Sequence, residues 1–264
     1  MEVVPGIGAL HPSHGRLFVV VGVFDGLHRG HAYLLEELRR AAAAREARPT
    51  VITFDHHPDE ILKGSAPPLL CDPDERLRRL EAAGVGVTVV QHFDVALRMT
   101  PYDRFVRDIA ARVELAGILM TPESSFGYER GGTPDTVAAL GRELGYEVAV
   151  VPPFELDGQP VRSSDIRAAI AAGDLRAAER LLGRPVSVVG TVDVAGREAT
   201  RIAFPVPVAL PPDGRYEAIV ESPGGALRHR NLEIEDGEVR LRPALVARRD
   251  DRARVEIRSR LPAG

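Results

Sequence analysis

The chain has 264 residues, 44% of them hydrophobic and 27% charged, which is typical of a folded protein with one α/β domain and a smaller partner. The formal net charge of −4 argues against a general nucleic-acid-binding protein, because such proteins are usually basic. Cys71 is the single cysteine, no apolar run approaches the roughly 18 residues of a membrane span, and the first residues lack the pattern of a secretory signal. We therefore expect a cytoplasmic protein without nucleic-acid or membrane partners.

Short apolar runs alternate with amphipathic segments through the first part of the chain. The apolar runs predict buried parallel strands at residues 17–23, 51–54, 87–90, 117–120 and 147–151. Helical spacing of the apolar residues predicts intervening helices at residues 31–45, 75–83, 102–113 and 136–144. This alternation predicts an α/β, Rossmann-like domain: a parallel sheet with helices on both faces and a ligand site at the carboxyl ends of its strands.

The character of the chain changes near residue 185. Two further helices are expected at residues 164–172 and 174–182. Short β-like runs separated by turn signals follow, at residues 186–192, 202–210, 215–220 and 252–257. The sequence thus predicts a first domain over residues 1–185 and a small antiparallel, barrel-like β domain over residues 186–264.

The first predicted strand runs into a glycine-rich segment, GVFDGLHRGH at residues 22–31. Glycines let a backbone approach a phosphate closely, and a helix N-terminus offers unpaired N–H groups and a positive dipole. His28 and His31 are three residues apart at this helix start, so they share one face. The segment therefore predicts a site in which both histidines donate hydrogen bonds to a polyphosphate.

A second polar cluster, TFDHHP at residues 53–58, follows the second predicted strand and should lie at the same edge of the sheet. Histidine and carboxylate side chains also leave open a zinc site among His28, His31, Asp55, His56 and His57. The third cluster, VRSSDIR at residues 161–167, opens a helix with hydroxyl groups and arginines, which are anion ligands.

Taken together and in this order, the three segments resemble the adenylyltransferase module of bacterial bifunctional riboflavin kinase/FAD synthetases. Members of that family show G-x-F-D-G-x-H-x-G-H, then T-F-D-P-H-P, then a helix start of the form S-S-x-I-R. Further similar stretches lie at residues 100–106, 126–127, 152–158 and 181–185. The resemblance covers residues 15–192.

The resemblance implies that ATP, carrying Mg²⁺, and FMN react to give FAD and pyrophosphate. It implies catalytic roles for His28, His31 and Arg167. The residues implied in ATP and phosphate binding are Gly22, Val23, Phe24, Asp25, Gly26, Gly30, Ser163 and Ser164. Those implied in flavin or acceptor binding are Asp55, His57, Glu123, Phe126 and Arg162. No metal ligand from the protein is predicted.

The chain departs from the family pattern at several positions. His56 stands where the family has proline, and Arg162 stands where it has the first serine of the serine-rich segment. Residues 123–127, ESSFG, replace a stretch of the form N/D-F-R-F-G near the flavin. These departures leave open a different phosphorylated acceptor, or a non-catalytic flavin- or nucleotide-binding role.

The β domain departs further. The family's riboflavin kinase barrel has a P-T-A-N motif whose threonine and asparagine serve Mg-ATP, and this chain has FPVPV at residues 204–208. Valine offers no oxygen to magnesium. A catalytic carboxylate aligns with either Glu233 or Glu238. We therefore expect a degenerate, truncated barrel without kinase activity.

Overall fold

The computed structural model describes residues 1–195, 198–221 and 225–262 and contains two compact units. The first unit comprises Met1–Phe24, Gly30–Pro67 and Arg76–Pro160, and the second comprises Asp25–Arg29, Pro68–Glu75 and Val161–Gly264. The helices of residues 163–182 group with the second unit, whereas a division at residue 185 assigns them to the first domain.

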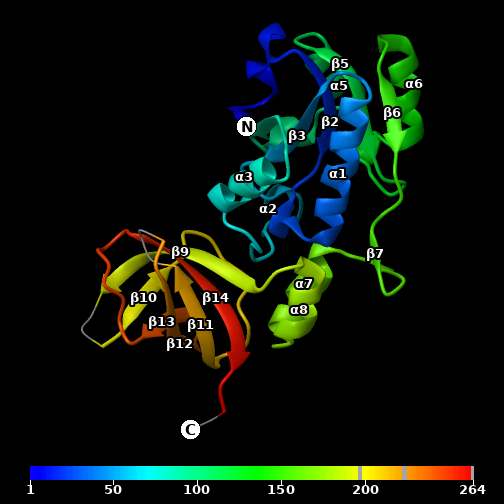
Figure 1. Ribbon diagram of the computed structural model, residues 1–264. Helices are drawn as coiled ribbons and strands as arrows, with labels where there is room; N and C mark the ends of the chain where they lie inside the picture. Colours follow the sequence, from blue (N-terminus) through cyan, green and yellow to red (C-terminus); the bar gives the residue numbers. More distant parts are fainter. Residues whose placement is uncertain (196–197, 222–224, 263–264) are drawn as a thin grey trace. The chain divides into compact units, whose positions relative to one another are not determined.

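The first unit is built on a parallel sheet (Figure 1). Its strands are β1 (Glu2–Val4), β2 (Arg16–Val21), β3 (Arg48–Phe54), β4 (Val87–Gln91), β5 (Glu114–Met120) and β6 (Glu147–Val150). The strand order is β1-β4-β3-β2-β5-β6. The order reverses between β2 and β5, and in open α/β sheets ligands bind beside such a switch point.

Helices and short turns connect these strands. The helices are α1 (Arg29–Ala43), α2 (Pro58–Lys63), α3 (Pro73–Ala82), α4 (Val95–Arg98), α5 (Tyr102–Ala110) and α6 (Pro134–Leu144). The 3-10 turns are η1 (Ile7–Ala9), η2 (Pro12–His14), η3 (Asp25–Leu27) and η4 (Tyr128–Arg130), and a small hairpin pairs β7 (Glu155–Leu156) with β8 (Gln159–Pro160). No helix among the described residues has both the length and the apolar character needed to cross a membrane.

The alternation of side chains along β2 divides the core between the two faces of the sheet. Leu17 and Val19 belong to a buried cluster that includes the apolar faces of α5 and α6. Phe18 and Val20 are also buried, and alternation directs them to the opposite face. The guanidinium of Arg45, just beyond α1, lies 4.9 Å from the centre of the Phe18 ring, which places α1 on that face (Figure 1). The predicted α/β architecture with helices on both faces is confirmed.

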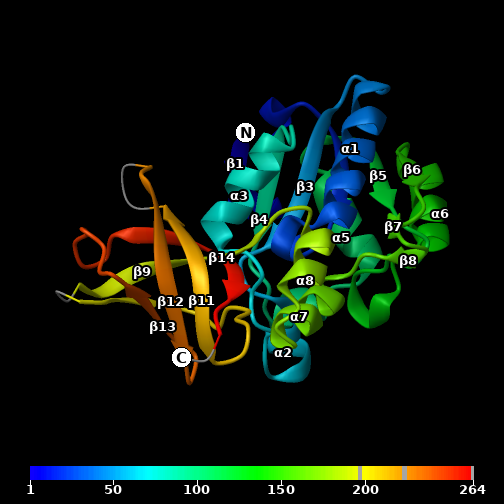
Figure 2. The ribbon, with the colours of Figure 1, turned by 60° about the horizontal axis from the view of Figure 1, so that its bottom comes forward.

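The second unit contains α7 (Ser163–Ala171), α8 (Leu175–Leu182) and a closed antiparallel barrel (Figure 2). Its strands are β9 (Val186–Ala195), β10 (Thr200–Ala203), β11 (Gly214–Glu221), β12 (Leu227–Glu235), β13 (Glu238–Arg242) and β14 (Arg252–Arg260). They pair in the order β10-β13-β12-β11-β14-β9, and β9 closes on β10. The barrel core includes fully buried Tyr216, Leu232, Val239, Leu241 and Val255.

The barrel strands differ in detail from the expectation. The run at residues 202–210 was expected to be one strand, but β10 ends at Ala203 because Pro205 and Pro207 have no N–H group to continue the ladder. Strands β12 and β13 were not predicted, since their outward-facing charged residues hide the apolar alternation. The short edge strand β1 and the short helices α2 and α4 were also missed.

Candidate functional site

An apolar cavity opens at the carboxyl ends of β2, β3 and β4 in the first unit. Its volume is about 590 Å³, within the usual range of ligand pockets. Its lining comprises Val21, Gly22, Val23, Phe54, Pro58, Leu62, Phe93, Leu97, Arg98, Thr100, Phe105, Ser125, Phe126, Gly127, Tyr128, Glu129 and Arg130. The rings of Phe54 and Phe93 meet edge to face at 5.2 Å, and those of Phe105 and Phe126 at 5.8 Å. We call this cavity the aromatic pocket; it is suited to a large planar ring system.

A second, more polar cavity of about 320 Å³ lies at the switch point between β2 and β5. Its lining comprises Val21, Ile118, Leu119, Met120, Thr121, Glu123, Ser124, Ser125, Phe126 and Arg130. The Ser124 hydroxyl lies 2.9 Å from both the backbone nitrogen and the hydroxyl of Thr121, and Arg130 Nε donates to Ser125 Oγ over 2.7 Å. This polar pocket shares Val21, Ser125, Phe126 and Arg130 with the aromatic pocket, so one ligand could extend through both.

The loop after β2 has an unusual backbone. Phe24 and Leu27 have positive φ angles of 54° and 38°, a conformation that costs free energy and is concentrated at functional sites. Gly26 has a φ of 77°, and a Cβ at this position would lie 3.0 Å from the Leu70 Cβ, so glycine is required there. The Phe24 ring lies 5.0 Å from the ring of His31, in the first turn of α1. The predicted strand–loop–helix arrangement of residues 22–31 is therefore present.

Within the second unit, His28 lies just before the first residue of α1 and is only 4% exposed. Burial, followed by the positive charges of Arg184 and Arg167, lowers its pKa from 6.5 to about 4. The imidazole is consequently neutral at pH 7, and one of its two ring nitrogens carries a hydrogen that can be donated. An anion bound beside these arginines would be stabilised by their charges.

Asp25 holds Arg167 in place. The Asp25 carboxylate, 4% exposed, accepts from Arg167 Nη2 at 2.5 Å and from the backbone N–H groups of Leu70 and Cys71 at 3.0–3.1 Å. Arg167 Nε donates to the Pro68 carbonyl at 2.8 Å, while its Nη1 makes no hydrogen bond to any part of the chain that the structure describes. The arginine is thus rigidly held with one donor group remaining for a ligand.

The start of α7 carries the serine-rich segment that the sequence predicts as an anion site. Arg162 occupies the N-cap position without capping the helix through its side chain. The Ser163 hydroxyl donates to the backbone carbonyl of Asp25 at 3.2 Å, and the Ser164 hydroxyl lies 3.2 Å from an Asp165 carboxylate oxygen. The second unit therefore brings His28, Arg167 and Ser163 together near Asp25, and a phosphate-binding role for these residues stays a prediction.

The predicted flavin or acceptor residues are more scattered. Phe126 lines both pockets and Glu123 lines the polar pocket. His57 instead caps α2, accepting from the backbone N–H of Asp59 at 3.2 Å. Asp55 lies beside His56 and His92, and neither Asp55 nor His57 lines either pocket. Their role in acceptor binding, like the role of Arg162, stays a prediction.

Sequence reasoning missed several residues of these sites. Arg184 belongs to a segment noted as similar to the family and as the domain boundary, but not as part of the site, and its effect on His28 depends on folding. Phe54 was part of the quoted TFDHHP motif, but nothing in the local pattern singled out Phe93 or Arg130. His92 follows β4 and carries no motif of its own.

Asp55 is held by its neighbours at the ends of β3 and β4. Burial acts to raise its pKa, but hydrogen bonds from His92, from His56 and from the backbone of Phe93 outweigh burial and lower that pKa to about 2. The hydrogen bond between His92 and Asp55 also raises the pKa of His92. The two form an ion pair, with His92 Nδ1 2.6 Å from the carboxylate.

The barrel contains a third cavity, of about 540 Å³. It is lined by Asp193, Arg201, Ile202, Ala203, Phe204, Pro205, Val206, Pro207, Val208, Leu210, Gly237 and Glu238. Of the two alternative carboxylates, Glu238 lines this cavity and Glu233 does not. Glu238 is paired with Arg240 at 2.6 Å and Arg201 at 3.6 Å, and the apolar side chains of Val206 and Val208 occupy the wall.

Comparisons with known proteins agree with this arrangement. The model of the FAD synthetase family matches residues 10–165. Several similar proteins are named bifunctional riboflavin kinase/FMN adenylyltransferase. The one from Pseudomonas fluorescens is 30% identical over 78% of this chain and 66% of its own length. The one from Haemophilus influenzae is 31% identical over 71% of this chain and 61% of its own length. The Escherichia coli K12 protein of that name is 30% identical over 78% of this chain and 66% of its own length. The chain therefore spans somewhat less than two-thirds of these relatives.

A solved structure shares the fold. The crystal structure of a macrolide-efflux protein from Streptococcus pneumoniae matches with a TM-score of 0.80 and 22% identity, covering 98% of this chain and 90% of that one. At this identity the likeness shows the architecture alone. The match of the family model to more than half of the chain, together with the relatives, shows that the chain belongs to the FAD synthetase family.

Proposed function

We propose that the protein is an FMN adenylyltransferase, which transfers AMP from ATP to FMN and yields FAD and pyrophosphate. The observation that carries the proposal is the aromatic pocket, which adjoins a polar pocket at the switch point of a FAD synthetase sheet. The rings of Phe54, Phe93 and Phe126 provide faces and edges for an isoalloxazine, and the adjoining polar groups suit the phosphate-bearing end.

The reaction needs positioning and charge stabilisation. A phosphate oxygen of FMN attacks the α-phosphorus of ATP, a phosphoanhydride bond forms, and the bond to the bridging oxygen breaks so that pyrophosphate leaves with the electron pair. The Nη1 group of Arg167, the ring N–H of His28 and the first N–H groups of α7 are donors for the phosphate oxygens. Asp25 is then a positioning residue, because its carboxylate is engaged by protein donors.

Magnesium would arrive with ATP and neutralise phosphate charge. The polar pocket offers hard oxygen atoms, the carboxylate of Glu123 and the hydroxyls of Thr121 and Ser124, and these are the ligand types that Mg²⁺ prefers. Glu123 therefore suits the cation at a position where the family pattern has asparagine or aspartate.

We further propose that the barrel does not phosphorylate riboflavin. In its cavity Val206 and Val208 provide no oxygen for Mg-ATP, and Glu238 is paired with two arginines. The single cysteine, buried Cys71, supports a cytoplasmic location, and the division of the chain at residue 185 stays our proposal for the domain boundary.

FAD formation from FMN and Mg-ATP tests the proposal, with riboflavin as a parallel substrate. We expect FMN to be converted and riboflavin to be left unchanged. The His28→Ala/His31→Ala double variant should lose at least about 100-fold in kcat, as expected when transition-state donors are removed. His229→Gln, an exposed change on β12, is the matched histidine control and should keep the wild-type rate. Turnover of riboflavin would contradict the barrel assignment.

A second candidate is adenylyl transfer to a different phosphorylated acceptor. It is favoured by residues 123–125 in the lining of the polar pocket, because they differ from the stretch that the family pattern has near the flavin and so change the groups offered to an acceptor. A Phe126→Ala variant separates the two candidates. It should raise KM for FMN with little change in KM for ATP if the aromatic pocket holds the flavin. If the wild type leaves FMN unchanged but transfers AMP from ATP to another phosphorylated compound, the second candidate is correct.

A further inference from the structure

Two histidines and a carboxylate meet at the ends of two neighbouring strands, outside both pockets. Strands β3 and β4 are parallel and in register, with Phe54 opposite Gln91. Asp55 and His92 are the next residues along each strand, so the sheet itself brings them together, and His56 follows Asp55. The Asp55 N–H donates to the Gln91 carbonyl at 3.2 Å, which holds the two strand ends together.

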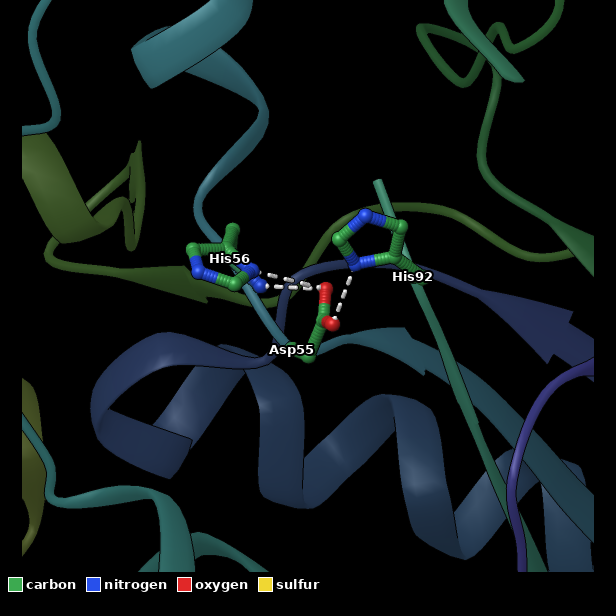
Figure 3. Close-up of side chains that lie close together, drawn as sticks. All are labelled: Asp55, His56 and His92. Atoms are coloured by element: carbon green, nitrogen blue, oxygen red, sulfur yellow. Dashed lines mark hydrogen bonds and ion pairs between the residues drawn. The ribbon is translucent and has the colours of Figure 1, made fainter. Parts of the chain in front are cut away.

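The three side chains point toward one another (Figure 3). His92 Nδ1 lies 2.6 Å from one oxygen of Asp55, and His56 Nδ1 lies 3.1 Å from the other. One potential ligand atom from each residue lies within 4.8 Å of the other two. The side chains of Asp55, His56 and His92 are 33%, 53% and 61% exposed, so an ion from solvent can reach them.

The carboxylate is the rigid member of the group. One Asp55 oxygen accepts from the backbone N–H groups of His56 at 2.7 Å and Phe93 at 3.1 Å. Such supporting hydrogen bonds orient metal ligands in proteins. The two imidazoles are exposed and can adjust by rotation about their side-chain bonds.

We propose that Asp55, His56 and His92 form a binding site for a divalent transition-metal ion such as Zn²⁺. Imidazole nitrogens favour Zn²⁺, Cu²⁺ or Ni²⁺ over Mg²⁺ and Ca²⁺, which prefer oxygen. Tetrahedral Zn²⁺ with ligands at about 2.0–2.2 Å needs ligand atoms roughly 3.3 Å apart. The two nitrogen–oxygen separations of 2.6 and 3.1 Å are somewhat shorter than that value, and all three ligand atoms lie within 4.8 Å of one another, so small rotations of His56 and His92 complete the site.

Three protein ligands leave one position of a tetrahedral ion open for water or for an anionic group. The site follows directly on two walls of the aromatic pocket, because Phe54 precedes Asp55 and Phe93 follows His92. The residues of this site differ from those of the zinc site that the sequence left open. Among the described residues, Asp55 and His56 form a group with His92. His57 instead caps α2, and His28 and His31 belong to no such group.

The test is metal binding to the full chain, stripped with a chelator and returned to chelator-free buffer. Zn²⁺ is titrated calorimetrically, and Co²⁺ is titrated by visible absorption, which reports tetrahedral coordination. We expect the wild type to bind one equivalent at this site. His92→Gln and His56→Gln should each weaken binding at least about tenfold. His229→Gln, another exposed histidine, should bind within about twofold of the wild type.

Thermal unfolding with and without Zn²⁺ gives a second measure. Because a ligand that binds only the folded state stabilises it, Zn²⁺ should raise the wild-type Tm and leave the Tm of His92→Gln much less changed. The metal-free Tm of the two ligand variants should match that of the wild type, which shows that they fold. Equal Zn²⁺ affinity of wild type and His92→Gln, or the absence of tetrahedral Co²⁺ absorption in the wild type, would overturn the site.

Discussion

At the scale of single residues, the group of predicted phosphate-binding residues in the second unit depends on one buried carboxylate. Asp25 accepts hydrogen bonds from Arg167 and from two backbone N–H groups, and Ser163 donates to its carbonyl. Burial, followed by the positive charges of Arg184 and Arg167, lowers the pKa of His28 and keeps that histidine neutral at pH 7. The local charge is therefore positive where a polyphosphate is expected, and the imidazole remains a hydrogen-bond donor without adding a charge.

Replacing Asp25 with alanine should destabilise the fold by about 3 kcal/mol, because the change leaves the Arg167 charge without its partner and two buried N–H groups without an acceptor. Urea denaturation monitored by circular dichroism measures this loss. Asp165→Ala, which removes an exposed carboxylate from α7, is the control. A loss for Asp25→Ala no larger than that of the control would show that the carboxylate does not hold the site together.

Stability should depend on pH through His28. Its pKa is about 4 in the folded protein and 6.5 when exposed, so the unfolded chain binds more protons between these values and stability falls as pH falls through this window. Because of this depressed pKa, the free energy of unfolding should be lower at pH 4 than at pH 7 by on the order of 3 kcal/mol. His28→Gln, which cannot be charged, should show a shallower decline in urea titrations between pH 4 and pH 7. An unchanged slope would assign the pH dependence to other groups.

At the scale of elements, strands β2 and β5 beside the polar pocket pack so closely that the residue at position 117 can have no side chain. Gly117 of β5 faces the ring of Phe18 in β2, and a Cβ at that position would lie 2.3 Å from the Phe18 ring and 2.7 Å from the Glu147 carbonyl. The absence of a side chain thus allows the aromatic residue to fill the space beside β5. The polar pocket begins one residue further along β5, at Ile118.

Gly117→Ala should therefore destabilise the protein by about 1–3 kcal/mol through overpacking. The same change should weaken ligand binding in the polar pocket, because β5 must move away from β2. Gly8→Ala is the matched control, since no atom lies within 4 Å of a Cβ there. Chemical denaturation compares the two variants, and equal stabilities would show that β2 and β5 accommodate the methyl group without strain.

At the scale of the whole molecule, each unit has buried apolar residues and a cavity of its own among the residues that the structure describes. Ile52 is fully buried in the parallel sheet, and Leu241 is fully buried in the barrel. The aromatic pocket belongs entirely to the first unit. A ligand in that pocket should stabilise the unit that contains it.

Scanning calorimetry should consequently resolve two unfolding transitions. Ile52→Ala should lower the midpoint temperature of one transition, and Leu241→Ala that of the other. Each substitution should reduce the free energy of unfolding of its own unit by about 2–5 kcal/mol, as for other large-to-small core changes. Added FMN should raise the transition that Ile52→Ala lowers. A single transition shifted by both substitutions would mean that the two units unfold together.

Much of the candidate site was predictable because its signals are local. The glycine-rich turn between a buried strand and a helix singled out His28 and His31 as candidates, and the helix start singled out Ser163 and Arg167; their roles stay predictions. The motif also named Asp25 as a nucleotide contact through its backbone, which stays a prediction, but it gave no sign that the Asp25 carboxylate accepts a hydrogen bond from Arg167.

The sequence by itself determined the alternation of strands and helices, the change to β structure near residue 185 and the anion-binding motifs, because periodicity and turn chemistry depend on near neighbours in the chain. Only the tertiary structure decided the order and register of the strands. That order joins Phe54 to Phe93 in one pocket wall and places His92 beside Asp55. These residues are separated by a helical crossover, and the contact arises only when β3 and β4 pair in parallel.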